Sequence, residues 1–244
     1  MQHNETYLPS SLSLSDLGLH AGTRPLGKQS RRGRTSSYPG MFASTKCLGP
    51  AVFDSLLERD FQTILSADPR VAAYAVQAHQ LTYWTPVQGG VFKQRRYTPD
   101  VVLRRTDGHM MIFEVKAEVF VHGAYWRERE PYIRKAYRQD HAVDFAVVTE
   151  RIIRIQPRLS NYQRMLRFGA RFSDQAAFTA VRDVLYGAVS PNTLGDVCMA
   201  AALSDNRMPR AYAALMALAL KGEITLELDR PLSPATLILR RHDS

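Results

Sequence analysis

The spacing of apolar residues changes from one segment of this chain to the next, and it predicts the helices and strands. Between residues 53 and 65 the apolar residues fall on one helical stripe, which Pro69 ends. A second helix is predicted over 124–139. Strands are predicted at 71–84 (one strand or two), 97–103, 110–116 and 143–149, with a continuation of the last at 151–155. This alternation favours an α/β core with a mixed sheet.

Residues 173–244 show a different order of elements. The predicted elements are a helix over 174–187 capped by Ser173, a helix that begins with a capping box at Thr193, a helix over 208–220, and a hairpin of strands 224–228 and 235–239. Three helices followed by a two-stranded wing is the order of a winged-helix domain. Such domains bind DNA or dock proteins, and the order of elements leaves both roles open.

Two segments lie outside these folded regions. Residues 1–40 combine serines, prolines and a basic cluster at 31–34 with little apolar periodicity, which predicts a flexible basic tail. Residues 156–172 are predicted to be an arginine-rich connector between a domain at 41–155 and a domain at 173–244. The surrounding run, residues 151–171, is either a solvated face or a phosphate-binding surface. It has no acidic residue and six arginines: Arg151, Arg154, Arg158, Arg164, Arg167 and Arg171.

The composition is typical of a folded protein with a polyanionic partner. Of 244 residues, 45% are hydrophobic and 23% charged, which excludes wholesale disorder. No apolar run approaches the roughly 18 residues of a membrane span, and the first residues lack the features of a secretory signal. Two cysteines, Cys47 and Cys198, cannot form a disulfide framework and favour a reducing compartment. The net charge of +9 favours nucleic acid as the partner, although a merely basic soluble protein is the simpler alternative.

The pattern that carries chemistry is Pro99-Asp100 on one predicted strand and Glu114-Val115-Lys116 on the next. Two carboxylates on neighbouring strands can hold a divalent cation such as Mg²⁺, which prefers oxygen ligands and activates water for attack on a phosphodiester. Because side chains alternate along a strand, Lys116 shares a face with Glu114 and can position the water or stabilise charge. The chain contains no P-loop motif and no serine-hydrolase elbow, so the usual sequence signatures of nucleotide-driven and serine-hydrolase activity are missing.

The length of the loop between these strands decides whether the two carboxylates meet. A two-residue turn at Asp107-Gly108 would pair Asp100 with Val115 and send the carboxylates to opposite faces. A three-residue loop, with Gly108 left-handed, pairs Asp100 with Glu114 instead. We predict the three-residue loop, because it also gathers the apolar side chains on the other face, as a half-buried hairpin requires: Val101, Leu103, Met111, Phe113 and Val115.

This short pattern also occurs by chance, and an exposed hairpin with a cross-strand Glu–Lys pair is the alternative. Glu58 favours the metal site. It lies on the preceding helix, at the edge of the apolar stripe beside Leu65. A carboxylate on a helix, ahead of a strand pair that bears two more, is the order used by PD-(D/E)xK nucleases.

Four segments between residues 42 and 150 carry a more specific pattern: Phe42-Ala-Ser-Thr-Lys46, Phe53-Asp-Ser-Leu-Leu-Glu-Arg-Asp-Phe61, Tyr97-Thr-Pro-Asp100 and Phe113-Glu-Val-Lys116. Together they resemble the TnsA endonuclease subunit of heteromeric transposases. The resemblance implies a restriction-endonuclease-like fold with a C-terminal winged-helix-like domain. It also implies a Mg²⁺-dependent nuclease, with Mn²⁺ able to replace Mg²⁺, that hydrolyses phosphodiesters at the 5′ ends of a transposon.

By position, the resemblance implies catalytic roles for Glu58, Asp100, Glu114 and Lys116, metal ligation by Glu58, Asp100, Glu114 and Val115, and a place near the site for Gln77. The implied partners are double-stranded transposon ends, a TnsB-like transposase and a TnsC-like AAA+ regulator, with no membrane. The implied location is the bacterial cytoplasm, at the nucleoid when DNA is bound. Two positions depart from the family pattern, Ala43 where Pro is frequent and Asp54 where Glu is frequent.

Arginines flank the predicted site and are expected to attract DNA to it: Arg95, Arg96, Arg104 and Arg105. The aromatic residues are expected to fill the core rather than stack on bases: Tyr74, Tyr83, Trp84, Tyr125 and Trp126. Three hypotheses follow. The chain is a TnsA-like endonuclease within a transposase assembly, a stand-alone restriction or repair nuclease of the same superfold, or a non-catalytic DNA-binding adaptor.

Overall fold

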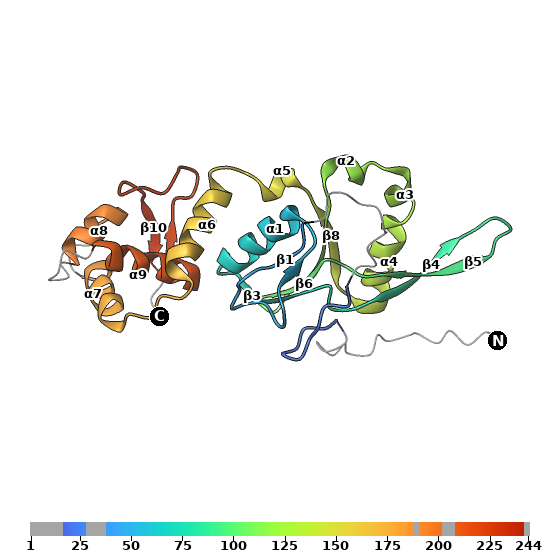
Figure 1. The fold of residues 1–244 in the computed structure, drawn as a ribbon, viewed down its shortest axis with the longest axis horizontal. Helices are drawn as coiled ribbons and strands as arrows, with labels where there is room; N and C mark the ends of the chain where they lie inside the picture. Colours follow the sequence, from blue (N-terminus) through green and yellow to red (C-terminus); the bar gives the residue numbers. More distant parts are fainter. Residues whose placement is uncertain (1–16, 28–37, 188–190, 202–207, 242–244) are drawn as a thin grey trace, which may run out of the picture. The chain divides into compact units, whose positions relative to one another are not determined.

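The computed structural model describes residues 17–27, 38–187, 191–201 and 208–241. The chain divides into two compact units: unit 1 comprises Met1–Arg59 and Val71–Arg151, and unit 2 comprises Asp60–Arg70 and Ile152–Ser244. The protein is mixed α/β, with a mixed sheet flanked by helices (Figure 1). Among the described residues, no helix has the length and apolar character needed to span a bilayer.

Unit 1 is built on a four-stranded sheet in the order β3-β6-β7-β8. Its strands are β3 (Val71–Val76), β6 (Val101–Arg105), β7 (Met110–Val115) and β8 (Asp144–Val148). Strand β6 is antiparallel to both β3 and β7, whereas β7 and β8 are parallel. The mixed sheet predicted from the sequence is therefore confirmed.

Both faces of the β6–β7 hairpin are covered. On one face a row of paired side chains crosses the four strands, and none of them is more than 3% exposed: Ala75, Val102, Ile112 and Phe145. Helix α4 (Glu130–His141) packs in the same core. On the opposite face Val101 and Leu103 are also buried. The prediction of a half-buried hairpin is wrong, because β6 and β7 are the two central strands and the core extends across both of their faces.

Proline residues explain two of the boundaries that differ from the predictions. Strand β5 (Phe92–Tyr97) ends at Tyr97 and β6 begins at Val101, because Pro99 between them has no N–H to donate to a ladder. The helix predicted over 124–139 is two helices, α3 (Ala124–Arg127) and α4, since Pro131 starts a new helix in its first turn. Residues after β8 form helix α5 (Glu150–Ile153) rather than a longer strand.

The remaining elements of unit 1 are short. They are the pair β1 (Gly40–Met41) and β2 (Val52–Phe53), the first turn of α1 (Leu56–Ala67), the ribbon of β4 (Leu81–Pro86) with β5, and α2 (Glu118–Val121). Part of the predicted tail also belongs to the core, because Leu17 and Leu19 are buried there. The basic cluster at residues 31–34 lies outside the described residues.

Unit 2 is organised around helix α9 (Met208–Lys221), which packs against three further helices. These are α6 (Arg158–Gly169), α7 (Gln175–Leu185) and α8 (Leu194–Ala200), and β9 (Ile224–Leu226) pairs with β10 (Ile238–Arg241). Helix α6 occupies the segment predicted as a connector. It approaches α9 so closely that a Cβ at Gly169 would lie 2.6 Å from the Ala217 backbone nitrogen. Thr193 caps α8 as predicted, whereas Asp174 rather than Ser173 caps α7.

The burial of His79 predicts that unit 1 loses stability in mild acid. One ring nitrogen lies 2.9 Å from the Tyr137 hydroxyl, and burial lowers the pKa of His79 to about 4. In the unfolded chain this histidine binds a proton near pH 6.5. Lowering the pH from 7.5 to 4.5 therefore favours the unfolded chain by about 2.5 kcal/mol through this group. Urea unfolding at the two pH values measures the effect. Between pH 7.5 and 4.5 the free energy of unfolding should fall by about 2.5 kcal/mol less in His79→Gln than in wild type.

His20→Gln is the matched control, because it removes an exposed histidine of the same unit. It should retain the wild-type change between the two pH values. The same pH dependence in wild type and His79→Gln would contradict the role assigned to His79.

Candidate functional site

The loop at residues 106–108 fixes the register of the β6–β7 hairpin. Val101 is paired with Phe113, and the Arg105 N–H donates to the His109 carbonyl at 2.9 Å. Gly108 has a φ of +86°, a left-handed conformation that glycine adopts without strain. The predicted three-residue loop is therefore confirmed.

This register places Asp100 beside the end of β7. One carboxylate oxygen of Asp100 accepts a hydrogen bond from the Val115 N–H at 2.7 Å. Asp100 and Glu114 are 2% and 4% exposed, so both carboxylates lie inside unit 1. A buried carboxylate is costly unless hydrogen bonds or opposite charge compensate it, which makes this pair an unusual feature of the core.

Glu114 lies between a cation and a phenol. Its Oε1 is 2.9 Å from the Lys116 Nζ, and its Oε2 accepts a hydrogen bond of 2.6 Å from the Tyr97 hydroxyl. Burial, followed by the nearby charges of Glu114 and Asp100, raises the pKa of Tyr97 well above its usual range, so the phenol remains a donor. The Lys116 Nζ also lies 4.3 Å from the centre of the Trp126 ring, which fixes the ammonium over an aromatic face.

Glu58 has a structural partner of its own at the start of α1. Its carboxylate accepts hydrogen bonds from the Asp54 N–H and the Ser55 hydroxyl, both at 3.0 Å, and the Ser55 hydroxyl accepts from the Glu58 N–H at 3.2 Å. Ser55 thus caps the helix, and the Glu58 carboxylate returns to the N–H of the preceding residue, Asp54, in a variant of the capping box. The sequence analysis placed Glu58 at the edge of the apolar stripe of this helix. The S-x-x-E spacing from Ser55 to Glu58 could also have predicted that Glu58 takes part in the helix cap.

A chain of hydrogen bonds joins the Glu58 cap to Asp100. The Gln77 side chain donates to an Asp54 carboxylate oxygen at 3.1 Å, and the Gln77 N–H donates to the Asp100 carbonyl at 2.9 Å. Asp54 in turn donates its own N–H to Glu58. Gln77 therefore links the helix start to the strand start, close to the place that the resemblance implied.

Part of the predicted metal site has suitable donors. Asp100 and Glu114 supply hard carboxylate oxygens on adjacent strands, and the one oxygen of Val115 is its backbone carbonyl, so these three residues fit the ligands that Mg²⁺ prefers. Within the described residues, no three acidic, histidine or cysteine side chains gather closely enough to hold a metal ion. The structure therefore brings together Asp100, Glu114 and Lys116, and leaves Glu58 at its cap.

The four arginines expected to flank the site fall at two separate places. Arg95 and Arg96 are exposed on β5, immediately ahead of Tyr97. Arg104 and Arg105 lie at the other end of β6 from Asp100, roughly 13–17 Å away at the usual rise of a strand. Arg105 is 3.2 Å from Asp107. Only Arg95 and Arg96 are near the residues that hold Glu114.

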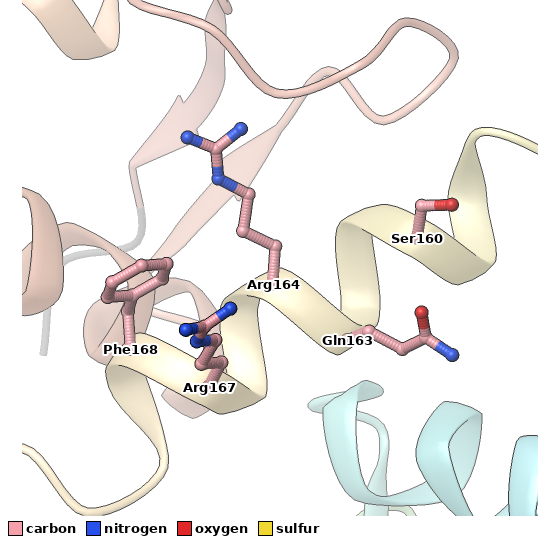
Figure 2. Close-up of a pocket in the computed structure, with 5 residues that line it drawn as sticks. All are labelled: Ser160, Gln163, Arg164, Arg167 and Phe168. Atoms are coloured by element: carbon pink, nitrogen blue, oxygen red, sulfur yellow. The ribbon is translucent and has the colours of Figure 1, made fainter.

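Arginines of the run 151–171, which contains no acidic residue, contact oxygen atoms from other segments of unit 2. Arg154 pairs with Asp60 of α1 at 2.8 Å, and Arg164 donates to the Leu232 carbonyl at 3.0 Å. A pocket of about 420 Å³ lies along α6. Figure 2 shows the residues that line it: Ser160, Gln163, Arg164, Arg167 and Phe168. Phosphate binding by this run stays a prediction.

Sequence reasoning missed the roles of Tyr97, Trp126 and Asp54. Tyr97 was visible as part of the Tyr97-Thr-Pro-Asp100 segment, but nothing in the pattern indicated its bond to Glu114. Trp126 is buried, as expected, and also carries the Lys116 contact. Trp84 and Tyr125 are 55% and 61% exposed, so their placement in the core was wrong.

Comparison of the chain with protein-family models gives no match, and neither does comparison with curated proteins.

Removal of the Tyr97 hydroxyl should destabilise unit 1. In Tyr97→Phe, Glu114 loses a donor while its carboxylate stays buried, which should lower the free energy of unfolding by about 1.5–3 kcal/mol. Urea denaturation at pH 7 measures this change. Tyr38→Phe, which removes an exposed hydroxyl, should change it by less than about 0.5 kcal/mol. Equal stabilities of the two variants would contradict the role of the Tyr97–Glu114 bond.

Proposed function

We propose that this chain is a Mg²⁺-dependent DNA endonuclease of the PD-(D/E)xK class, acting as a TnsA-like subunit of a heteromeric transposase. The observation that carries the proposal is the cluster of Asp100, Glu114 and Lys116. A hydrogen bond from Val115 to Asp100 and an ion pair between Lys116 and Glu114 hold this cluster inside a mixed sheet. Buried carboxylates with an adjacent ammonium are more typical of a catalytic centre than of a structural hairpin.

The architecture of both units supports the same class. In a restriction-endonuclease-like fold one carboxylate stands at the start of a central strand, and the E-x-K residues lie at the end of the next strand. Here Asp100 directly precedes β6, Glu114 and Val115 end β7, and Lys116 follows directly. In unit 2 the helices α7, α8 and α9 come before the β9–β10 pair, in the order of a winged helix. We assign unit 2 to that class and to the docking of partners.

Each residue of the cluster has a distinct task in phosphodiester hydrolysis. Asp100, Glu114 and the Val115 carbonyl would hold Mg²⁺, which when bound lowers the pKa of water and offsets negative charge on the phosphate. Tyr97 orients Glu114 through its hydroxyl. Lys116, held against Trp126, provides a fixed positive charge beside the attacked phosphate or orients the attacking water.

The surplus of positive charge supports DNA as the substrate, with transposon ends as the form that the TnsA resemblance implies. In this proposal the chain cuts the 5′ ends. A TnsB-like transposase processes the 3′ ends, and a TnsC-like AAA+ protein regulates the complex in the bacterial cytoplasm.

Cleavage of end-labelled transposon-end duplex, with and without the cognate transposase, tests the proposal. We expect Mg²⁺-dependent cuts at the 5′ ends that EDTA abolishes. Lys116→Met and Asp100→Asn should each lower the rate at least about 100-fold, the usual effect of removing one preorganised electrostatic group. Lys135→Met, which removes an exposed lysine of α4, is the matched control and should cleave like wild type.

The other two hypotheses give different results in this assay. Cleavage that needs no transposase would indicate a stand-alone nuclease. DNA processing that survives either Lys116→Met or Asp100→Asn would indicate a non-catalytic adaptor, the alternative that the use of Glu58 in a helix cap favours.

A further inference from the structure

The β4–β5 ribbon leaves one complete face uncovered. Its six residue pairs keep one register from Leu81–Tyr97 to Pro86–Phe92. All six side chains on one face are exposed, in the pairs Thr82–Arg96, Trp84–Gln94 and Pro86–Phe92. Trp84 is 55% and Phe92 is 61% exposed, although aromatic residues of this size usually lie in a core or at an interface. Figure 1 shows the ribbon reaching beyond the sheet and helices of unit 1.

The opposite face holds the ribbon in place. Leu81 and Tyr83 are buried in the core of unit 1, and the Tyr83 hydroxyl accepts a hydrogen bond of 2.6 Å from Arg129. Thr85 is also buried, and accepts a long hydrogen bond from Arg95 at 3.4 Å. Alternate side chains of β4 therefore anchor the ribbon to unit 1, while the opposite face of the ribbon stays exposed.

The charge of the ribbon indicates what covers this face. Residues 81–97 contain three cations, Lys93, Arg95 and Arg96, and no acidic residue. Aromatic side chains among cations suit a polyanion that also presents apolar groups, and duplex DNA does so through the thymine methyl groups of its major groove. A second copy of the ribbon would bring like charges together, so charge disfavours self-association through this face.

We propose that the exposed face of the β4–β5 ribbon enters the major groove of DNA beside the cleavage site. A two-stranded ribbon fits that groove, which is about 12 Å wide and about 8.5 Å deep. Gln94 and Arg96 reach base edges, for which amide and guanidinium groups are suited, while Trp84 and Phe92 contact the thymine methyl groups that line the major groove. Lys93 and Arg95, on the other face, contact the phosphates that border the groove.

The ribbon is continuous with the candidate site. Its last residue, Tyr97, donates to Glu114, and Asp100 follows three residues later. DNA gripped by the ribbon is thus held next to the two buried carboxylates. The position of the cut rests on the proposed function, whereas the groove contact itself requires no catalysis.

DNA binding without cleavage tests the ribbon. Fluorescence anisotropy with a labelled mixed-sequence duplex of 30 base pairs, in EDTA, measures Kd for the full chain. We expect Trp84→Ala and Arg96→Ala each to weaken binding about tenfold, the effect of losing one contact to a base edge or a thymine methyl group. Lys135→Ala, the loss of an exposed cation outside the ribbon, should stay within about twofold of wild type. Methyl green, a major-groove ligand, should displace the protein, whereas the minor-groove ligand netropsin should not.

Three results would overturn the proposal: wild-type affinity in both ribbon variants, displacement by netropsin alone, or a dimer in sedimentation that Trp84→Ala disperses while DNA affinity is unchanged. The last result would assign the face to a second copy of the chain. Failure of the proposed function is a separate result. Ribbon-dependent DNA binding without Mg²⁺-dependent cleavage would retain the groove contact and remove the nuclease assignment.

Discussion

The hydrogen bond from the Val115 N–H to the Asp100 carboxylate is the constraint on which the candidate site depends. It joins the residue that precedes β6 to the end of β7, and it forms because the loop between the strands has three residues. One residue fewer would turn Asp100 and Glu114 to opposite faces, since side chains alternate along each strand. The conformation of Gly108, at the far end of the hairpin, thus determines whether two carboxylates meet at this end.

Burial gives this cluster its chemical character. The same face of the sheet that carries Asp100 and Glu114 also carries Val102 and Ile112, neither of which is exposed. In such surroundings an ammonium and a phenol act strongly on Glu114, because little water screens them. The arrangement that lowers the cost of burying the carboxylate also holds Lys116 and Tyr97 in fixed positions, as a catalytic centre requires.

Local patterns in the sequence predicted the mixed sheet and the hairpin register, because loop length and alternation are encoded within a few residues. They did not predict contacts between distant segments. The covering of one face of β6–β7 depends on α4, the place of β7 inside the sheet depends on β8, and the partner of Arg154 is Asp60, far away in the chain. The metal-ligand role of Glu58 came from the resemblance and stays a prediction, whereas its hydrogen bonds with Ser55 could be predicted from the S-x-x-E spacing alone.

The backbone of Gln77 gives a further reason why the helix start and the strand start belong together. Gln77 has a φ of +47°, a left-handed conformation that costs a side-chain-bearing residue of order 1–3 kcal/mol. Three hydrogen bonds offset this cost: its N–H donates to Asp100, its carbonyl accepts from Leu26, and its side chain donates to Asp54. Because Asp54 also binds Glu58, the strain at Gln77 is supported by the same contacts that tie the cap of α1 to Asp100. A chain of hydrogen bonds through Asp54 and Gln77 thus connects the Glu58 carboxylate to the backbone of Asp100.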